Sequence, residues 1–196
     1  SRMATPNVAI ITNVGEGHLE FLGSVDAVVK AKAEIMNGMK PDSIIVLNKD
    51  LIHFTELAET AIRLQLIVKT FALEEDADYK VESYILQENG ITMTVADQTI
   101  TVPLMGIHNV YNVVGAFAVA MECGMNVSQI ISALEEMTPV EGRSEYIYGD
   151  LTIINDTYNA NPLSMKLAFQ SVKAMFSERK KIAVLSDMKE LGEQGP

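Results

Sequence analysis

The sequence VAIITNVGEGH, residues 8–18, decides the fold class of this chain. It opens with four apolar residues, Val8–Ile11, and a continuous apolar run of this length predicts a strand that is buried on both faces. The run ends in a polar, glycine-bearing loop that carries His18. A buried strand that leads directly into a polar loop is typical of parallel sheets with helices on both faces.

The residues that follow repeat this pattern. A helix is predicted from Ser24, as N-cap, to about Gly38. Two more buried strands are predicted at 44–47 and 67–71, with a helix at about 55–66 between them. Strands that alternate with helices predict a parallel sheet, in which ligands bind beyond the carboxyl ends of the strands.

The pattern then changes to an antiparallel meander. Residues 81–86, 91–95 and 99–102 alternate polar and apolar side chains, and Asn89-Gly90 is a strong hairpin-turn signal. Helices are predicted to follow at about 108–123 and 127–137, the second after Asn126 as N-cap.

A new unit begins after the helix-breaking sequence TPVEG at 138–142. A strand at 151–154, a helix at about 163–176 and a strand at 181–185 predict the start of a βαβ unit. The fold class is therefore α/β, a mostly parallel sheet with flanking helices and an antiparallel meander, followed by a truncated Rossmann-like βαβ unit. We place the domain boundary within 139–145, which gives domains at 1–140 and 141–196.

Composition excludes several classes of function. The 196 residues are 48% hydrophobic, enough for a sizeable core, and the net charge of -11 argues against nucleic acid as the main partner. An anionic ligand must therefore be held locally, by backbone N–H groups, a metal ion or a few cations. The single cysteine, Cys123, excludes an internal disulfide and fits the cytoplasm, and no apolar run reaches the roughly 20 residues of a membrane span.

Lys32 stands out in the predicted helix at 24–38. At about 100° per residue it falls near the centre of an apolar stripe, whereas Lys30 points the opposite way. A lysine on a core-facing stripe must reach solvent, find a partner, lose its proton or be chemically changed. The stripe consists of Val25, Val28, Val29, Ile35, Met36 and Met39.

His18 and Lys32 could share one pocket, since a strand-end loop leads into the helix that turns Lys32 inward. Reaction of Lys32 with carbon dioxide would convert its ammonium into a carbamate, an oxygen-donor anion able to ligate Mg²⁺. The alternatives are a solvated loop histidine and a lysine that reaches solvent at the rim of the core.

Four further polar residues are candidates for ligand binding. Asn109 and Asn112 lie three apart at a helix start, so their amides share a face and suit a nucleobase edge, although caps and surface positions are the common alternative. Arg143 at the domain junction could reach a phosphate, or form a surface ion pair. Asp156 follows a buried strand and could accept ribose hydroxyls, or form a turn before Pro162.

Taken in order, these segments resemble the Mur ligases, the ATP-dependent amide-forming enzymes of peptidoglycan synthesis. The resemblance spans nearly the whole chain and is greatest to members that add D-alanyl-D-alanine to UDP-N-acetylmuramoyl-tripeptide. It rests on ITNVGEGHLE at 11–20, AKAEI at 31–35, GIHNVYN at 106–112, GRSE at 142–145, DTYNANP at 156–162 and SDMKELG at 186–192.

The resemblance implies roles for these residues. Lys32 would be carbamylated and would hold Mg²⁺ together with His18. Asn109 and Asn112 would contact the adenine of ATP, Arg143 its phosphates or ribose, and Asp156 its ribose. The side chains of Asn159 and Asn161 would line the cleft between the domains.

The implied reaction activates the terminal carboxylate of the tripeptide as an acyl phosphate, which the amine of D-alanyl-D-alanine then attacks. The sequence contains no Gly-x-x-x-x-Gly-Lys-Ser/Thr phosphate loop, so we expect this chain to be an inactive fragment. The whole enzyme is expected to be cytoplasmic and monomeric. Two alternatives remain open: a ligase similar to folylpolyglutamate synthase, and a noncatalytic nucleotide-binding or scaffold domain.

Overall fold

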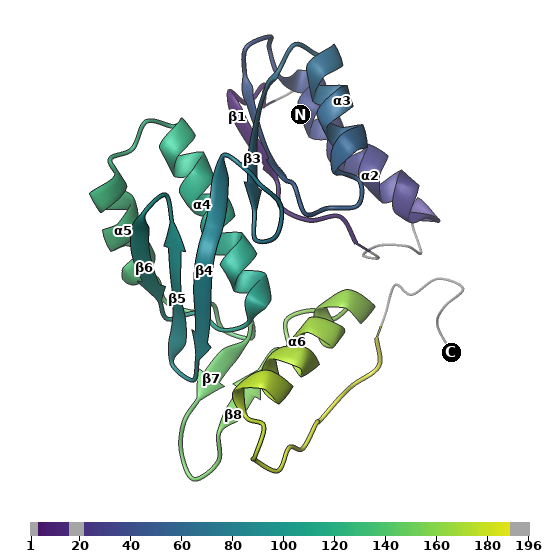
Figure 1. The fold of residues 1–196 in the computed structure, drawn as a ribbon. Helices are drawn as coiled ribbons and strands as arrows, with labels where there is room; N and C mark the ends of the chain where they lie inside the picture. Colours follow the sequence, from purple (N-terminus) through teal and green to yellow (C-terminus); the bar gives the residue numbers. More distant parts are fainter. Residues whose placement is uncertain (1–3, 16–21, 189–196) are drawn as a thin grey trace.

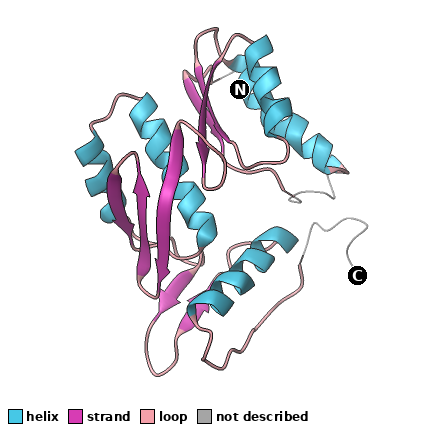
Figure 2. Ribbon diagram, viewed as in Figure 1, coloured by secondary structure: helices cyan, strands magenta, loops and turns pink. Residues whose placement is uncertain are grey.

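A six-stranded mixed sheet forms the body of the molecule (Figures 1 and 2). The computed structural model describes residues 4–15 and 22–188. Strands β1 to β4 run parallel to one another, and β4, β5 and β6 form the antiparallel meander, so the expected fold class is confirmed. The strands are β1 (Val8–Ile11), β2 (Ile44–Asn48), β3 (Ile67–Ala72), β4 (Tyr79–Gln87), β5 (Gly90–Val95) and β6 (Gln98–Val102).

Helices cover both faces of this sheet. Ile45 and Leu47 of β2 belong to a core that includes residues of α2 and α3, whereas Val46 belongs to a second core that includes residues of α4 and the meander. Alternate side chains of a strand point to opposite faces, so one buried strand serves both cores. The helices are α2 (Val25–Ala33), α3 (Phe54–Arg63), α4 (Ile107–Glu122), α5 (Val127–Glu135) and α6 (Pro162–Met175).

The helix predicted at 24–38 is shorter than expected. Ser24 caps it as expected, accepting a hydrogen bond from the backbone N–H of Ala27 at 3.2 Å. The α-helix ends at Ala33, and a 3₁₀ helix occupies Glu34–Gly38. Because a 3₁₀ helix turns about 120° per residue, the wheel angles inferred beyond Ala33 do not apply.

The turn between β4 and β5 lies one residue earlier than expected. Gln87 pairs with Gly90, so Glu88 and Asn89 form the turn and Gly90 begins β5. A Cβ on Gly90 would lie 2.4 Å from the carbonyl oxygen of Val102 in β6. Glycine is therefore needed here for close contact with the neighbouring strand, rather than as a turn residue.

The C-terminal part differs most from the sequence-based expectation. The strand β8 (Ile153–Asn155) pairs antiparallel with β7 (Glu145–Ile147), which the sequence analysis missed, and α6 follows. The strand expected at 181–185 is wrong, because this segment pairs with no other strand among residues 4–15 and 22–188. Its apolar side chains are exposed, and an apolar run without a partner strand cannot form the ladder that defines a strand.

The carboxylate of Asp50 ties β2 to two other elements near the cleft side of the sheet. It accepts hydrogen bonds from the backbone N–H groups of Leu73, Glu74 and Glu75, and from the hydroxyl of Tyr111 on α4. Desolvation alone would raise the pKa of Asp50, but these hydrogen bonds outweigh it and hold the pKa below its ordinary value.

Asp50→Asn is expected to lower the free energy of unfolding by about 2 kcal/mol near pH 7, since an amide cannot satisfy several donors at once. A carboxyl with a lowered pKa stabilises the fold above the unfolded value of about 3.9, and this contribution is lost as the pH falls through the folded value. The free energies of unfolding of wild type and Asp50→Asn, measured by urea titration, should therefore approach each other as the pH falls below about 4. The exposed Asp97→Asn is the control, and an equal loss in both variants would contradict the prediction.

Candidate functional site

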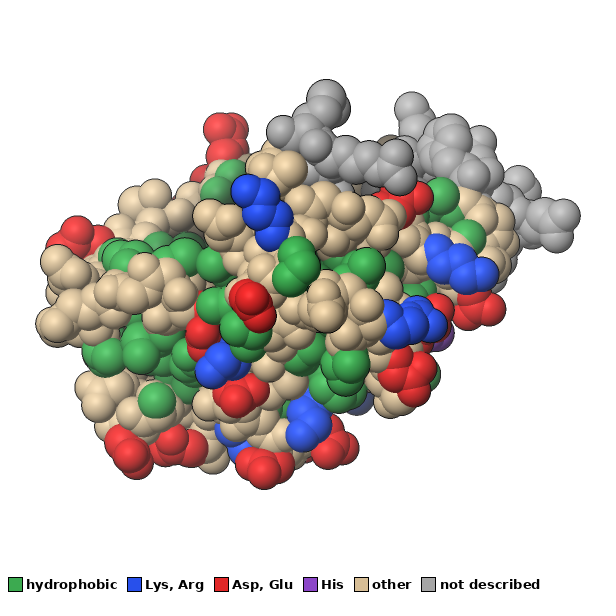
Figure 3. All heavy atoms as spheres, turned by 90° about the horizontal axis from the view of Figure 1, so that it is seen from above, with side chains coloured by type: hydrophobic (Ala, Val, Ile, Leu, Met, Phe, Trp, Pro, Cys, Tyr) green, Lys and Arg blue, Asp and Glu red, His purple; other side chains and the backbone are tan. Residues whose placement is uncertain are grey.

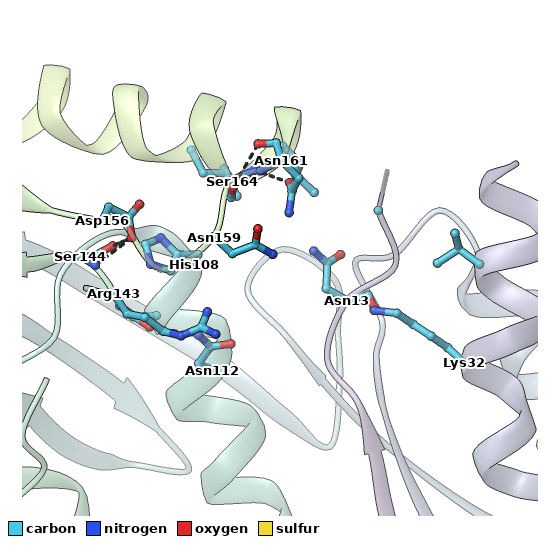
Figure 4. Close-up of a pocket in the computed structure, with 15 residues that line it drawn as sticks. Asn13, Lys32, His108, Asn112, Arg143, Ser144, Asp156, Asn159, Asn161 and Ser164 are labelled. Atoms are coloured by element: carbon cyan, nitrogen blue, oxygen red, sulfur yellow. Dashed lines mark hydrogen bonds between the residues drawn. The ribbon is translucent and has the colours of Figure 1, made fainter. Parts of the chain in front are cut away.

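A cleft of about 440 Å³ lies between the carboxyl ends of the parallel strands and the C-terminal part (Figure 4). The loop after β1, helix α2, the start of α4, the segment before β7 and the loop between β8 and α6 all contribute to it. Its lining is mainly polar. The residues are Asn13, Gly15, Val28, Lys32, His108, Asn109, Asn112, Arg143, Ser144, Asp156, Asn159, Asn161, Leu163, Ser164 and Leu167.

Lys32 reaches this cleft from one turn beyond the buried Val28. Its Nζ donates a hydrogen bond of 2.6 Å to the backbone carbonyl of Asn13, which follows β1. The prediction that Lys32 lies on the same helix face as the buried Val28 was correct. The prediction that it lies at the centre of the core-facing stripe was wrong, because Lys32 is exposed, at the point where the core opens into the cleft. Partial burial of its ammonium still lowers the pKa of Lys32 below its ordinary value.

Asn109 and Asn112 share one face of α4, as the spacing predicted. The amide of Asn112 donates to the side-chain oxygen of Asn109 at 3.0 Å, and the amide of Asn109 donates to the backbone carbonyl of Met105 at 2.9 Å. The preceding residue, His108, also lines the cleft. Burial lowers the pKa of His108, and the nearby Asp156 partly offsets this, so the imidazole favours its neutral form.

Arg143 forms a cation–π contact at the other side of the cleft. Its guanidinium carbon lies 3.9 Å from the ring centroid of Tyr158. The backbone N–H of Tyr158 donates to the carbonyl of Gly142 at 3.0 Å, which keeps the two segments side by side. The guanidinium thus keeps its donors available to an anionic group in the cleft.

Asp156 is held close to Arg143 by Ser144, the residue that follows Arg143 in the chain. The backbone N–H of Ser144 donates to one carboxylate oxygen of Asp156 at 2.9 Å. Glu145 cross-links the same pair of segments, accepting from the backbone of Gly142 at 3.2 Å and from the amide of Asn155 at 2.9 Å. Arg143 and Asp156 therefore lie on one hydrogen-bonded unit.

Asn159 and Asn161 come from the loop that precedes α6. In Figure 4 the amide of Asn159 points across the cleft toward Asn13. Asn161 caps α6, its side chain accepting from the backbone N–H of Ser164 at 2.9 Å while the hydroxyl of Ser164 accepts from the backbone N–H of Asn161 at 3.0 Å. Asn161 combines a place in the cleft with the capping role typical of asparagine before a helix.

The structure thus brings seven of the eight predicted site residues to one cleft, and the eighth, His18, lies outside the described residues. The sequence analysis did not select Asn13, His108, Ser144 or Ser164. Asn13, His108 and Ser144 lie within quoted motifs, and the positions of the first two in the strand-end loop and at the helix start could have identified them. Ser144 and Ser164 contribute through local hydrogen bonds that sequence spacing does not reveal.

The described residues contain no group of three or more His, Cys, Asp or Glu side chains that could hold a metal ion. The cleft instead offers paired amides, one guanidinium, one carboxylate and an amine of lowered pKa. This set of groups suits an anionic ligand that also carries a hydrogen-bonding ring and hydroxyls. None of the described helices is long and apolar enough to cross a membrane.

Two family models match the chain. The model described as "Mur ligase middle domain" matches residues 1–120, and the model described as "Mur ligase, glutamate ligase domain" matches residues 142–195. Among curated proteins, the UDP-N-acetylmuramoyl-tripeptide--D-alanyl-D-alanine ligase of Bacillus subtilis is 36% identical over 98% of this chain. The Haemophilus influenzae protein of the same name is 32% identical over 98% of it. The chain spans about two fifths of the length of these relatives, 42% of each.

Solved structures give the same result. MurF from Acinetobacter baumannii superposes with a TM-score of 0.90 at 28% identity, covering 99% of this chain and 43% of that one. MurF ligase from Thermotoga maritima, solved in complex with ADP, superposes with a TM-score of 0.84 at 28% identity, covering 99% and 45%. An FPGS from L. casei has a TM-score of 0.72 at 24% identity over 89% of this chain and 44% of that one, which shows a shared fold.

Proposed function

Because the chain belongs to the Mur ligase family, we propose that it forms the nucleotide cleft of an ATP-dependent amide ligase. The proposed reaction adds D-alanyl-D-alanine to UDP-N-acetylmuramoyl-tripeptide in peptidoglycan synthesis, in a cytoplasmic and monomeric enzyme. The observation that carries the proposal is the cleft itself, where Lys32, Asn112, Arg143 and Asp156 converge from separate elements.

In this proposal the cleft binds ATP through complementary groups. The amides of Asn109 and Asn112 contact the adenine edge, because an amide offers both a donor and an acceptor. Arg143 pairs with phosphate or ribose oxygens, and the carboxylate of Asp156 accepts ribose hydroxyls. Asn159 and Asn161 orient the acceptor substrate where the two parts of the chain meet.

Lys32 is suited to the proposed carbamate. Carbamylation needs the neutral amine as nucleophile, since the nitrogen lone pair attacks the carbon of carbon dioxide and one proton is released. The lowered pKa of Lys32 raises the neutral fraction, and the carbamate N–H could keep the hydrogen bond to the carbonyl of Asn13. Together with His18, the carbamate would hold Mg²⁺, which when bound neutralises phosphate charge.

The proposed transfer then has two steps. A carboxylate oxygen of the tripeptide attacks the γ-phosphorus of ATP, giving the acyl phosphate and ADP. The amine of D-alanyl-D-alanine attacks the acyl carbon, phosphate leaves, and the amine proton passes to solvent. The residues of this chain contribute by binding and orienting the reactants, which is the main source of catalysis in phosphoryl transfer.

A chimaeric enzyme tests this proposal. The matching segment of the Bacillus subtilis ligase is replaced by residues 1–196 of this chain, and phosphate release from Mg-ATP and UDP-N-acetylmuramoyl-tripeptide is measured with and without D-alanyl-D-alanine. We expect release that depends on the dipeptide from the chimaera and none from the 196-residue chain alone. A folded chimaera that binds ATP but gives no dipeptide-dependent release would contradict the proposal.

The carbamate has its own prediction. Incubation of the chain with ¹³C-bicarbonate should give one slowly exchanging carbamate resonance, whose intensity grows with pH because more of the Lys32 amine is neutral. The resonance should be absent from Lys32→Ala and present in Lys30→Ala, the lysine on the opposite face of α2. A chain that folds and lacks the resonance at every pH would favour the noncatalytic scaffold.

A further inference from the structure

The C-terminal part joins the rest of the molecule without sharing its hydrophobic core. Among the described residues, neither of the two core clusters contains a side chain from β7, β8 or α6. An interface that buries few apolar side chains is weak, so relative motion of the two parts is the default expectation. Their observed arrangement must depend on a small number of specific contacts.

Helix α6 provides two of these contacts at the cleft. A Cβ on Gly15 would lie 2.9 Å from the side chain of Leu163, in the first turn of α6. A Cβ on Gly106 would lie 3.1 Å from the hydroxyl of Ser171, in the middle of the same helix. In both places α6 lies close to the backbone of a glycine, Gly15 after β1 and Gly106 before α4, and both glycines lie at or next to residues that line the cleft.

A polar contact at the far end of α6 is separate from the cleft. Arg179 follows α6, and its Nη2 lies 3.1 and 3.2 Å from the two carboxylate oxygens of Glu88, in the turn between β4 and β5. Its Nη1 donates to the hydroxyl of Thr152 at 3.3 Å. The hydroxyl of Tyr148, which follows β7, donates to the backbone carbonyl of Glu88.

The turn at Glu88 thus receives groups from both sides of the C-terminal part, from the β7–β8 hairpin and from the segment after α6. In Figure 1 this turn lies next to β7 and faces the lower end of α6. The four residues Glu88, Tyr148, Thr152 and Arg179 are named here the hairpin latch. In this hydrogen-bonded network the guanidinium of Arg179 is held by both Glu88 and Thr152. Contacts from two directions favour one orientation of the C-terminal part over other nearby orientations.

We propose that the hairpin latch is a positioning device, which holds the C-terminal part in the orientation that aligns Arg143 and Asp156 with Asn112 across the cleft. It acts through those residues and contacts no ligand itself. The pair of Glu88 and Arg179 is about half exposed, with side-chain exposures of 51% and 53%, so its contribution is modest and sensitive to salt. A modest contribution is suited to a contact that must also open, so that the C-terminal part can move away from the turn at Glu88, which is here called the released state.

Charge reversal at the latch tests the proposal on the 196-residue chain. Spin labels are placed on the native Cys123, which is exposed, and on a cysteine introduced by Lys173→Cys on the exposed side of α6. Distances between the labels are measured by pulsed electron resonance in wild type, E88R, R179E and the E88R/R179E double variant. The control is E82R, which makes the same charge change on β4. The carboxylate of Glu82 accepts a hydrogen bond from the backbone N–H of Asp97 and takes no part in the hairpin latch.

We expect each single reversal to lower the ratio of latched to released chains about fivefold, the upper value for an exposed pair. The double variant should restore the ratio to within about twofold, 1 M salt should reproduce the effect of a single reversal, and E82R should change nothing. Unchanged distances in the single variants, or a double variant that stays released, would overturn the proposal.

A second readout rests on the proposed function. In the chimaeric ligase, E88R and R179E should raise the KM for ATP more than they lower kcat, and the double variant should reverse the change. The two readouts can fail separately. Shifted label distances with an unchanged KM would contradict the claim that the latch aligns Arg143 and Asp156 with Asn112. The label distances themselves do not depend on whether ATP is the ligand.

Discussion

Lys32→Ala in the chimaeric ligase is expected to lower the rate of D-alanyl-D-alanine addition by about 10³-fold, corresponding to about 4 kcal/mol of lost transition-state stabilisation. The proposed carbamate is the only anionic group that α2 would bring to the cleft, and alanine removes it together with the hydrogen bond to the carbonyl of Asn13. Initial rates of dipeptide-dependent phosphate release at saturating substrates measure the loss.

Short carboxylates separate chemistry from structure in this variant. Formate or acetate can enter the space left by the side chain and supply the missing anion, so we expect partial recovery of the rate in Lys32→Ala. Lys30→Ala, on the opposite face of the same helix, should keep the wild-type rate. Full activity of Lys32→Ala, or a loss that no carboxylate restores, would count against the carbamate.

Phe117→Ala is expected to lower the free energy of unfolding by about 4 kcal/mol. Phe117 lies on α4, is 0% exposed, and packs edge-on against Tyr79 of β4 with ring centroids 6.1 Å apart. Its removal leaves a cavity where α4 meets the sheet, and the parallel strands beneath a long helix cannot collapse to fill it. Urea denaturation monitored by circular dichroism gives the value.

Phe169 on α6 provides the matched control. Phe169 is 47% exposed, so Phe169→Ala removes the same atoms from a half-exposed position without leaving a closed cavity, and a loss below about 1 kcal/mol is expected. Equal losses in the two variants would show that α4 does not carry the main core.

The sequence predicted most of the sheet because its signals are local. The apolar run at Val8–Ile11 and the alternation in the meander depend only on which faces of a strand are buried, and both strand positions agree with the structure. The site was also largely predictable, since polar residues that follow buried strands lie at one edge of a parallel sheet. Asn109 and Asn112 lie together for a different local reason, because residues three apart on a helix share a face.

The parts that were missed depend on contacts distant in the sequence. The strand expected at 181–185 has the right composition, but no neighbouring strand pairs with it among the described residues. Lys32 has the right helix face, but its burial depends on where the core ends and the cleft begins, which no wheel angle gives. The hairpin latch joins Glu88 to Arg179, 91 residues apart, and spacing carries no information about such a pair.

The two-residue connections of the meander have a consequence for the order of folding. Gln87 pairs with Gly90 and Val95 with Gln98, and both residues of the second turn, Ala96 and Asp97, have positive φ. Closing such short loops costs little chain entropy, whereas β1, β2 and β3 pair only after a helix has been brought across. The meander is therefore the expected nucleus, so that refolding kinetics should respond first to substitutions in β4, β5 and β6, and the cleft should be assembled last.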